Sequence, residues 1–244
     1  TIALFGPNCH ISDLNAIAKM DRICDDIGVD TIETANAMAV CMEAGKIPWG
    51  DTDAVLGLLK EMADGTEFGY LLGDGCEAMG KKLGCKRIPV VKHQALAGYD
   101  PRNTKGTGIT YATCPMGADH TAGLTMGRAF DDCGRAAQAY VSNKLQVAIS
   151  FADSMMCIFA FSNMVPGIPL LGELMAGMYG GKSDFSRVAS IGVKTLLTER
   201  AFNQMAGMTK QDDRLPEFFY TERSVATGSQ FDIIDEELDT IFDF

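Results

Sequence analysis

Helical periodicity constrains this chain more than any other feature of its sequence. In the first 84 residues, apolar side chains recur at helical spacing in successive runs, and glycines end the runs. Glycine readily adopts the left-handed conformation that closes a helix, so each of these glycines marks an expected helix end. Helices are therefore expected over residues 12–28, 31–45, 52–65 and 68–83.

The pattern changes after Gly84. Short β-leaning pieces, IPVVK and GITYAT, are separated by Gly, Pro and Asp up to Gly127, so we expect a domain boundary and the wall of a site here. The tail from Gln211 is polar and then acidic, and we interpret it as a solvated end. Helices are expected again over residues 129–161, 170–178 and 183–206. The sequence thus predicts an all-α, multihelical fold with two helical subdomains, residues 1–95 and 96–244.

Charge and apolar content limit the environment and the partners of the chain. The formal net charge of −11 over 244 residues argues against nucleic acid and anionic membrane as partners. The longest apolar stretch, residues 148–165, is interrupted by Ser, Asp and Asn, so no transmembrane span is expected. The first residues contain no basic segment typical of a signal peptide. We expect a cytoplasmic protein.

The eight cysteines have irregular spacings, and no two form a Cys-x-x-Cys pair. Several, such as Cys24 and Cys41, occupy apolar positions of the helical patterns, which indicates reduced, buried thiols for most of them. The chain alone is therefore not expected to supply a zinc site or four local ligands for an iron–sulfur cluster.

Four segments, read in order, resemble the second and third domains of the aldehyde:ferredoxin oxidoreductase family. The first contains the IGVDTI turn between two predicted helices, the second a Tyr-Asp-Pro-Arg and a Gly-Ala-Asp-His, the third a cysteine, and the fourth a late helix followed by Leu-Pro. Each segment alone is weak evidence, but four in the family's order are specific. The segments are residues 8–39, 90–120, 152–159 and 198–219.

The resemblance implies the C-terminal helical part of a tungsten- or molybdenum-pterin enzyme. In the intact protein, a bis-pterin metal centre and a [4Fe-4S] cluster would oxidise a small aldehyde to a carboxylic acid and pass electrons to a ferredoxin-like carrier. An upstream domain or subunit would supply the remaining cofactor contacts, so we expect this chain to bind no complete cofactor alone.

Two aspartates are the candidate pterin-binding residues that the resemblance implies. A pterin edge presents a ring N–H and an exocyclic NH2 side by side, and a carboxylate accepts two parallel donors well. Asp30, after Gly28, would hold one pterin, and Asp153 would hold the other. The alternative for Asp30 is an ordinary helix-start carboxylate that caps the helix beginning at Thr31.

The resemblance also assigns one cluster ligand and one catalytic residue. Cys157 corresponds to the family's last [4Fe-4S] ligand, and the alternative is a packed thiol in the apolar stretch SMMCIFAF. His120 would lie near the metal, where an imidazole can orient an aldehyde oxygen or move a proton near neutral pH. The alternative for His120 is a structural histidine.

Several positions depart from the family's usual pattern and leave the substrate open. Asp153 lies four residues before Cys157, one fewer than in the usual Asp-x-x-Gly-Leu-Cys, and Ala122 replaces a basic residue two positions after His120. Ala95 replaces a usual acidic residue. Two other functions are therefore kept: a relative that acts on an aromatic acyl-thioester, and a helical scaffold or interaction module that has lost its cofactor.

Overall fold

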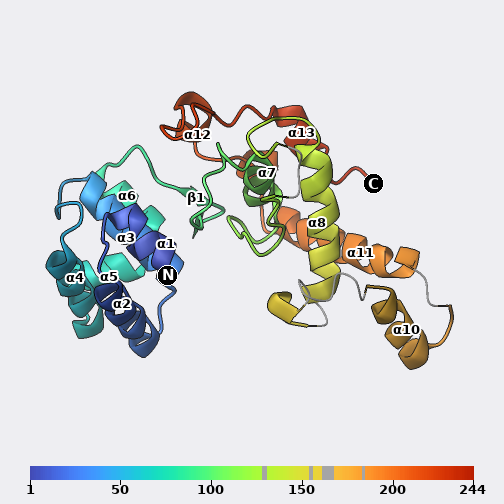
Figure 1. Ribbon diagram of the computed structural model, residues 1–244, viewed down its shortest axis with the longest axis horizontal. Helices are drawn as coiled ribbons and strands as arrows, with labels where there is room; N and C mark the ends of the chain where they lie inside the picture. The colour runs from blue at the N-terminus through green and yellow to red at the C-terminus, as the bar shows by residue number, and fades with distance from the viewer. Residues whose placement is uncertain (128–130, 154–155, 161–167, 183–184) are drawn as a thin grey trace. The chain divides into compact units, whose positions relative to one another are not determined.

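A computed structural model describes residues 1–127, 131–153, 156–160, 168–182 and 185–244, and these residues form a mostly helical structure (Figure 1). The predicted fold class is confirmed. The chain divides into two compact units: unit 1 contains residues 1–100 and 215–223, and unit 2 contains residues 101–214 and 224–244. The family domain boundary between residues 95 and 96 stays a prediction.

Among the described residues, no helix has both the length and the apolar content needed to cross a membrane.

Unit 1 is a set of helices around α3, whose residues from Thr34 to Met42 are all buried. Side chains such as Phe5, Met20, Leu59 and Met79 fill the core around it, and α3 packs against α1 and α6 (Figure 1). The elements are α1 (Ile2–Phe5), η1 (Pro7–Cys9), α2 (Leu14–Ile27), α3 (Thr31–Glu43), α4 (Thr52–Asp64), α5 (Glu67–Gly73), α6 (Cys76–Leu83), the antiparallel pair β1 (Val90–Val91) and β2 (Gln94–Ala95), and α12 (Phe218–Thr221).

Aspartate caps and glycine stops set the bounds of the first helices. The Asp13, Asp30 and Asp51 carboxylates accept backbone N–H groups at the starts of α2, α3 and α4, which satisfies donors that a helix start leaves unpaired. Gly28 ends α2 in the left-handed conformation, with φ 77°. The helix expected over residues 68–83 is instead two helices, because Gly75, with φ 96° and ψ −179°, breaks it.

Glu33 in α3 ties three elements of unit 1 together. One carboxylate oxygen accepts the Cys76 N–H at the start of α6 at 2.8 Å, and the other accepts the Ala95 N–H of β2 at 2.8 Å. A carboxylate suits the start of a helix because the backbone N–H groups and the helix dipole both favour negative charge there. Glu33 therefore fixes α6 and the β-hairpin against α3.

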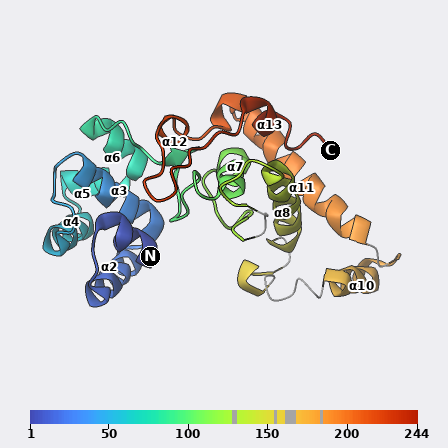
Figure 2. The same cartoon turned by 45° about the horizontal axis from the view of Figure 1, so that its top comes forward.

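Unit 2 is built around α8, against which α7 and α11 pack (Figure 2). Phe151 and Ala152 of α8 form a small core with Leu171 and Met175 of α10 and Val188 of α11. The elements are α7 (Lys105–Thr113), α8 (Gln138–Asp153), α10 (Ile168–Tyr179), α11 (Phe185–Met205), η3 (Lys210–Asp212) and α13 (Asp235–Asp239).

The segment GITYAT, expected to lean toward β structure, is part of the helix α7. All nine residues of α7 are buried, so tertiary contacts outweigh the β propensity of its Ile, Thr and Tyr side chains. Gly106 and Gly108 allow this packing: a Cβ on Gly108 would lie 2.6 Å from the Phe231 ring and 2.7 Å from Pro101 Cβ. The other β-leaning piece, IPVVK, contributes the short strand β1.

Two further expectations differ from the structure. The long helix expected over residues 129–161 begins only at Gln138, because Asp131 accepts the Cys133 N–H in a turn and Gln138 donates to the Asp131 and Gly134 carbonyls; residues 129, 130, 154, 155 and 161 lie outside the described part. The tail is not a solvated end. Several of its apolar side chains are buried, namely Phe231, Ile233, Leu238, Ile241 and Phe242, whereas Val225, Ile234 and Phe244 are exposed.

Most cysteine thiols are buried, as the sequence indicates. Five are buried, Cys85 and Cys133 are partly buried, and Cys157 is exposed; all eight are free. Burial raises the pKa of Cys24 and that of Cys41 to about 11, because a thiolate is costly away from water. These two thiols stay protonated at neutral pH and act as small packing groups.

The contact between α7 and Phe231 gives a testable prediction. Gly108→Ala should lower the free energy of unfolding by about 1–3 kcal/mol, because the new methyl group has no room beside Phe231 and Pro101. Gly57→Ala is the matched control: Gly57 lies in the middle of α4, and nothing beyond the backbone of its own helix comes within 4 Å of the place that the methyl group would take. Urea denaturation should show the control unchanged or stabilised; an equal loss in both variants would contradict the packing assigned to α7.

Candidate functional site

Unit 2 contains a cavity with a volume of about 650 Å³. Its walls come from three segments: the loop after α7, the C-terminal half of α8 and the C-terminal half of α11. The wall residues are Cys114, Pro115, Met116, Asp119, Thr121, Ala122, Gln146, Ile149, Ser150, Asp153, Thr195, Leu196, Thr198, Glu199, Phe202 and Asn203.

The loop after α7 carries the Asp119-His120 pair. Asp119 is 7% exposed, and its carboxylate accepts the Thr121 N–H at 2.9 Å and the Thr121 hydroxyl at 2.6 Å. The loop is thereby held in a tight turn of the kind that Asp favours. His120 Nδ1 lies 3.9 Å from Asp119 Oδ1, and the His120 side chain is 28% exposed. Because Asp119 and Thr121 both line the cavity, His120 lies on the segment that forms its wall.

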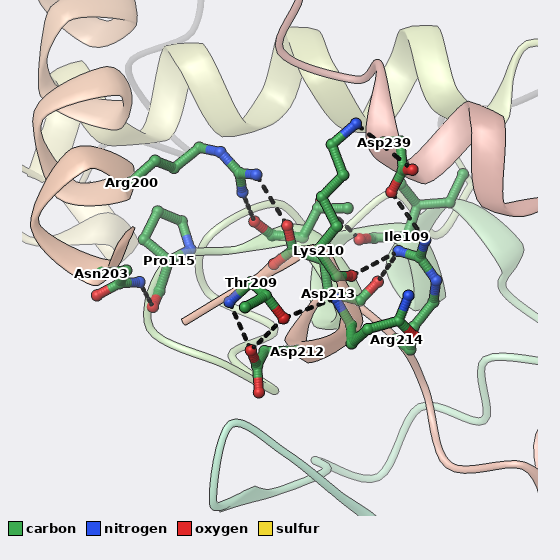
Figure 3. Close-up of polar contacts among 12 residues, drawn as sticks. Ile109, Pro115, Arg200, Asn203, Thr209, Lys210, Asp212, Asp213, Arg214 and Asp239 are labelled. Atoms are coloured by element: carbon green, nitrogen blue, oxygen red, sulfur yellow. Dashed lines mark hydrogen bonds and ion pairs between the residues drawn. The ribbon is translucent and has the colours of Figure 1, made fainter. Parts of the chain in front are cut away.

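Two side chains of α11 fasten this loop (Figure 3). Arg200 donates to the Thr113 carbonyl at 3.1 Å and to Asp213 Oδ2 at 2.8 Å. Asn203 donates to the Pro115 carbonyl at 2.7 Å. The backbone that leaves α7 is therefore bonded to α11 at two points before it reaches Asp119. Charge-assisted bonds of the Arg200 type are shorter and stronger than neutral ones.

A buried row of polar side chains joins α7 to α8 behind the cavity. Thr110 Oγ1 contacts Ser142 Oγ at 2.8 Å and donates to the Gly123 carbonyl. Gln146 Nε2 donates to Thr113 Oγ1 at 3.0 Å and to Ser142 Oγ at 3.2 Å. Since buried polar groups are costly unless they are hydrogen-bonded, these contacts set the register of α7 against α8.

Negative charge gathers at the cavity. Asp153, the last residue of α8, and Glu199 of α11 both line it. Partial desolvation and, secondarily, the nearby Asp153 carboxylate raise the pKa of Glu199 above its ordinary value. The two side chains are exposed to solvent at the cavity, so both can meet a ligand.

The predicted site residues fall in both units. Asp30 belongs to unit 1, where its Oδ2 accepts the Glu33 N–H at 2.7 Å; the capping role proposed as an alternative is thus observed. In unit 2, Asp153 lines the cavity and His120 is flanked by lining residues, whereas the exposed Cys157 is not among the described lining residues. Their assigned functions stay predictions. Within the described part of the chain, no group of three or more His, Cys, Asp or Glu side chains is arranged to hold a metal ion.

Most polar residues of the cavity were not predicted from the sequence, among them Gln146 and Glu199. Both lie on helices of unit 2, and the helical pattern gives their spacing but not which face meets a cavity. Glu199 belongs to the segment TERAFN that carries part of the family resemblance. A weak signal was therefore present for Glu199 and absent for Gln146.

Comparisons with known proteins agree with the resemblance found in the sequence. A family model described as aldehyde ferredoxin oxidoreductase, domains 2 & 3, matches residues 1–243. The tungsten-containing aldehyde ferredoxin oxidoreductase of Pyrococcus furiosus is 26% identical over 242 residues, which cover 89% of this chain and 40% of that protein. The protein of the same name from Thermococcus kodakarensis is 26% identical over 245 residues, covering 91% and 40%. The chain thus spans about two fifths of the length of these curated relatives.

Because the pKa of Glu199 is raised, replacing Glu199 with Gln should stabilise the chain by an amount that depends on pH. A carboxyl group with a raised folded pKa favours the folded state below its unfolded pKa, and this contribution is lost as pH rises through the folded value. Glu199→Gln should therefore stabilise the chain at pH 7 by less than about 1 kcal/mol, because the group is partly exposed. The gain should shrink toward pH 4. Glu173→Gln, an exposed change of equal charge on α10, is the control for net charge; equal gains in both variants would contradict the local cause.

Removing the Arg200 hydrogen bonds should destabilise the folded chain. Arg200→Ala should lower the free energy of unfolding by about 2–4 kcal/mol, because Asp213, whose side chain is 6% exposed, loses its guanidinium partner. The control is Arg22→Ala, which removes a surface pair with Asp26 whose side chains are 74% and 54% exposed and should change stability by less than about 1 kcal/mol. Urea denaturation compares the two variants, and similar small effects would mean that Arg200 does not fasten the loop.

Proposed function

The chain belongs to the aldehyde ferredoxin oxidoreductase family, and on that premise we propose that it is the C-terminal helical part of a tungsten- or molybdenum-pterin enzyme that oxidises small aldehydes. The observation that carries the proposal is the match of residues 1–243 to the family's domains 2 and 3. The reaction is RCHO + H2O → RCOOH + 2 H⁺ + 2 e⁻. A ferredoxin-like protein is the proposed acceptor of the electrons, and an upstream domain or subunit supplies the rest of the site.

The geometry around His120 supports an active-site role. Its loop is fastened through Arg200 and Asn203 and closed by the Asp119–Thr121 turn, so the imidazole lies on a backbone with little freedom. The side chain nevertheless keeps 28% of its surface accessible. A positioned, accessible imidazole can hydrogen-bond an aldehyde oxygen or take up a proton as water adds to the carbonyl.

The side chains assigned to the cofactor are chemically suited to it. Asp30 and Asp153 are exposed carboxylates, and carboxylates accept the paired N–H donors of a pterin edge. The Asp30 oxygen that is not engaged by Glu33 N–H can accept such a donor while the cap is kept. Cys157 is a free, exposed thiol that a cluster could reach, but one thiol cannot hold a [4Fe-4S] cluster without three others.

Each residue then has a distinct task. The metal–pterin centre and cluster, when bound, supply two-electron oxidation and one-electron transfer. Asp30 and Asp153 orient the pterin rings, and Cys157 anchors one corner of the cluster. His120 orients the carbonyl and moves a proton, while Arg200 positions the loop that carries it.

Metal content tests the proposal directly. The chain, co-expressed with the segment encoded upstream of it in tungstate- or molybdate-supplemented medium, should contain tungsten or molybdenum and about four irons per chain. Elemental analysis and the absorption of the oxidised cluster measure both. Folded protein without metal and iron would support the helical scaffold instead and would contradict the enzyme.

Two substitutions separate the proposed tasks. His120→Ala should keep metal and iron but lower kcat/KM for aldehydes by about 10²- to 10⁴-fold, whereas Cys157→Ser should lose iron. The controls are His93→Ala, which removes a surface histidine paired with Glu77, and Cys133→Ser, which alters a thiol that contacts the Asn103 carbonyl. Unchanged kcat/KM in His120→Ala, or unchanged iron in Cys157→Ser, would refute the respective assignment.

A further inference from the structure

The Asp119 carboxylate lies beside the imidazole of His120, the residue proposed to act on the aldehyde. The Asp119 side chain is 10% exposed, and its Oδ1 lies 3.9 Å from His120 Nδ1. At this separation the contact is electrostatic rather than a hydrogen bond. Because little water reaches the carboxylate, the interaction is screened less than it would be on an open surface.

Hydrogen bonds within the loop fix both partners. The Thr121 N–H donates to Asp119 Oδ1 at 2.9 Å, and the Thr121 hydroxyl donates to Asp119 Oδ2 at 2.6 Å. The Asp119 N–H donates to the Gly117 carbonyl at 2.7 Å, and the Gly123 N–H donates to the His120 carbonyl at 3.3 Å. A carboxylate oxygen can accept more than one donor, so Asp119 Oδ1 keeps the capacity to interact with the imidazole.

The carboxylate affects where the imidazole carries its hydrogen. A neutral imidazole is protonated on either Nδ1 or Nε2, and the partner of one nitrogen selects the form. If His120 Nδ1 lacked its hydrogen, its lone pair would lie near an anionic oxygen, which is unfavourable. With Nδ1 protonated, the N–H dipole is attracted to the same oxygen. The contact with Asp119 therefore favours the form with the hydrogen on Nδ1.

We propose that Asp119 is a positioning residue that holds neutral His120 with its hydrogen on Nδ1 and its lone pair on Nε2. This form requires no cofactor, whereas its consequence for the reaction rests on the proposed function. In the reaction, Nε2 takes up the proton that is released as water adds to the aldehyde carbonyl. Once protonated, Nε2 can donate a hydrogen bond to the carbonyl oxygen, and Nδ1–H stays beside Asp119 throughout.

Nuclear magnetic resonance of the full chain tests the form of the imidazole directly. The chain has three histidines, so ¹⁵N-histidine labelling and long-range ¹H–¹⁵N spectra at about pH 8, where imidazoles are neutral, can distinguish the rings. Replacing each histidine in turn assigns the signals, and His93, whose Nδ1 contacts Glu77 Oε2, is the internal reference. His120 should be protonated mainly on Nδ1. A ring protonated mainly on Nε2 in the unsubstituted chain would overturn the proposal.

A charge-removing variant tests the part played by Asp119. Asp119→Asn keeps the shape of the side chain and should lower the ratio of the Nδ1–H to the Nε2–H form of His120 by about three- to tenfold. Asp243→Asn removes an exposed charge of the same unit and should leave the ratio unchanged. Circular dichroism checks that both variants are folded. An unchanged ratio in Asp119→Asn would overturn the proposal.

Kinetics of the complete metal-loaded enzyme test the consequence for the reaction. Asp119→Asn should lower kcat by about 10- to 10³-fold and change KM by less than about threefold, because the interaction serves proton transfer rather than aldehyde binding. Elemental analysis should show unchanged metal and iron. An unchanged kcat would refute the positioning role. Failure of the proposed function would appear differently, as an unsubstituted enzyme that oxidises no aldehyde although His120 is protonated on Nδ1.

Discussion

The hydrogen-bonded contact between α7 and α8 is the constraint on which the structure of unit 2 depends. All of α7 is buried, including the hydroxyls of Thr107, Thr110 and Thr113. A buried hydroxyl without a partner costs free energy, so such a helix is stable only in a register that satisfies each group. Ser142 and Gln146 of α8 supply partners for Thr110 and Thr113. An apolar contact would tolerate sliding, whereas this row of donors and acceptors specifies one arrangement.

The candidate site follows from that arrangement. The chain leaves α7 at Thr113 and enters the loop that carries His120 within a few residues, and α11 binds the carbonyls at the start of the loop through Arg200 and Asn203. Gln146 takes part in both features, because its NH2 group belongs to the α7–α8 contact and its residue lines the cavity. The same helices that stabilise the unit therefore also form the cavity walls and hold the loop that carries the imidazole.

The sequence predicts helices whose ends are set by local interactions. It does not predict structure that depends on contacts between residues far apart in the sequence. The helices α2, α3 and α4 follow from apolar spacing, aspartate caps and glycine stops, all of which act within a few residues. GITYAT belongs to a fully buried helix in which Gly108 lies against Phe231, a residue far along the chain. In the tail, Phe231 and Ile233 are buried, and Asp232 between them pairs with Lys105 of α7 at 2.7 Å. The family resemblance is confirmed across the chain, but Gln146 entered the site only through three-dimensional packing. The functions of Asp30, His120, Asp153 and Cys157 stay predictions.

We propose that the His120 loop and Cys157 face the metal centre and the cluster of an intact oxidoreductase. Anomalous diffraction at the tungsten and iron edges, from crystals of the complete metal-loaded enzyme, tests it most directly. We expect a tungsten peak beside the His120 loop and an iron peak within bonding distance of Cys157 Sγ. Peaks remote from both residues, with the cavity between α8 and α11 turned away from the metal, would contradict it.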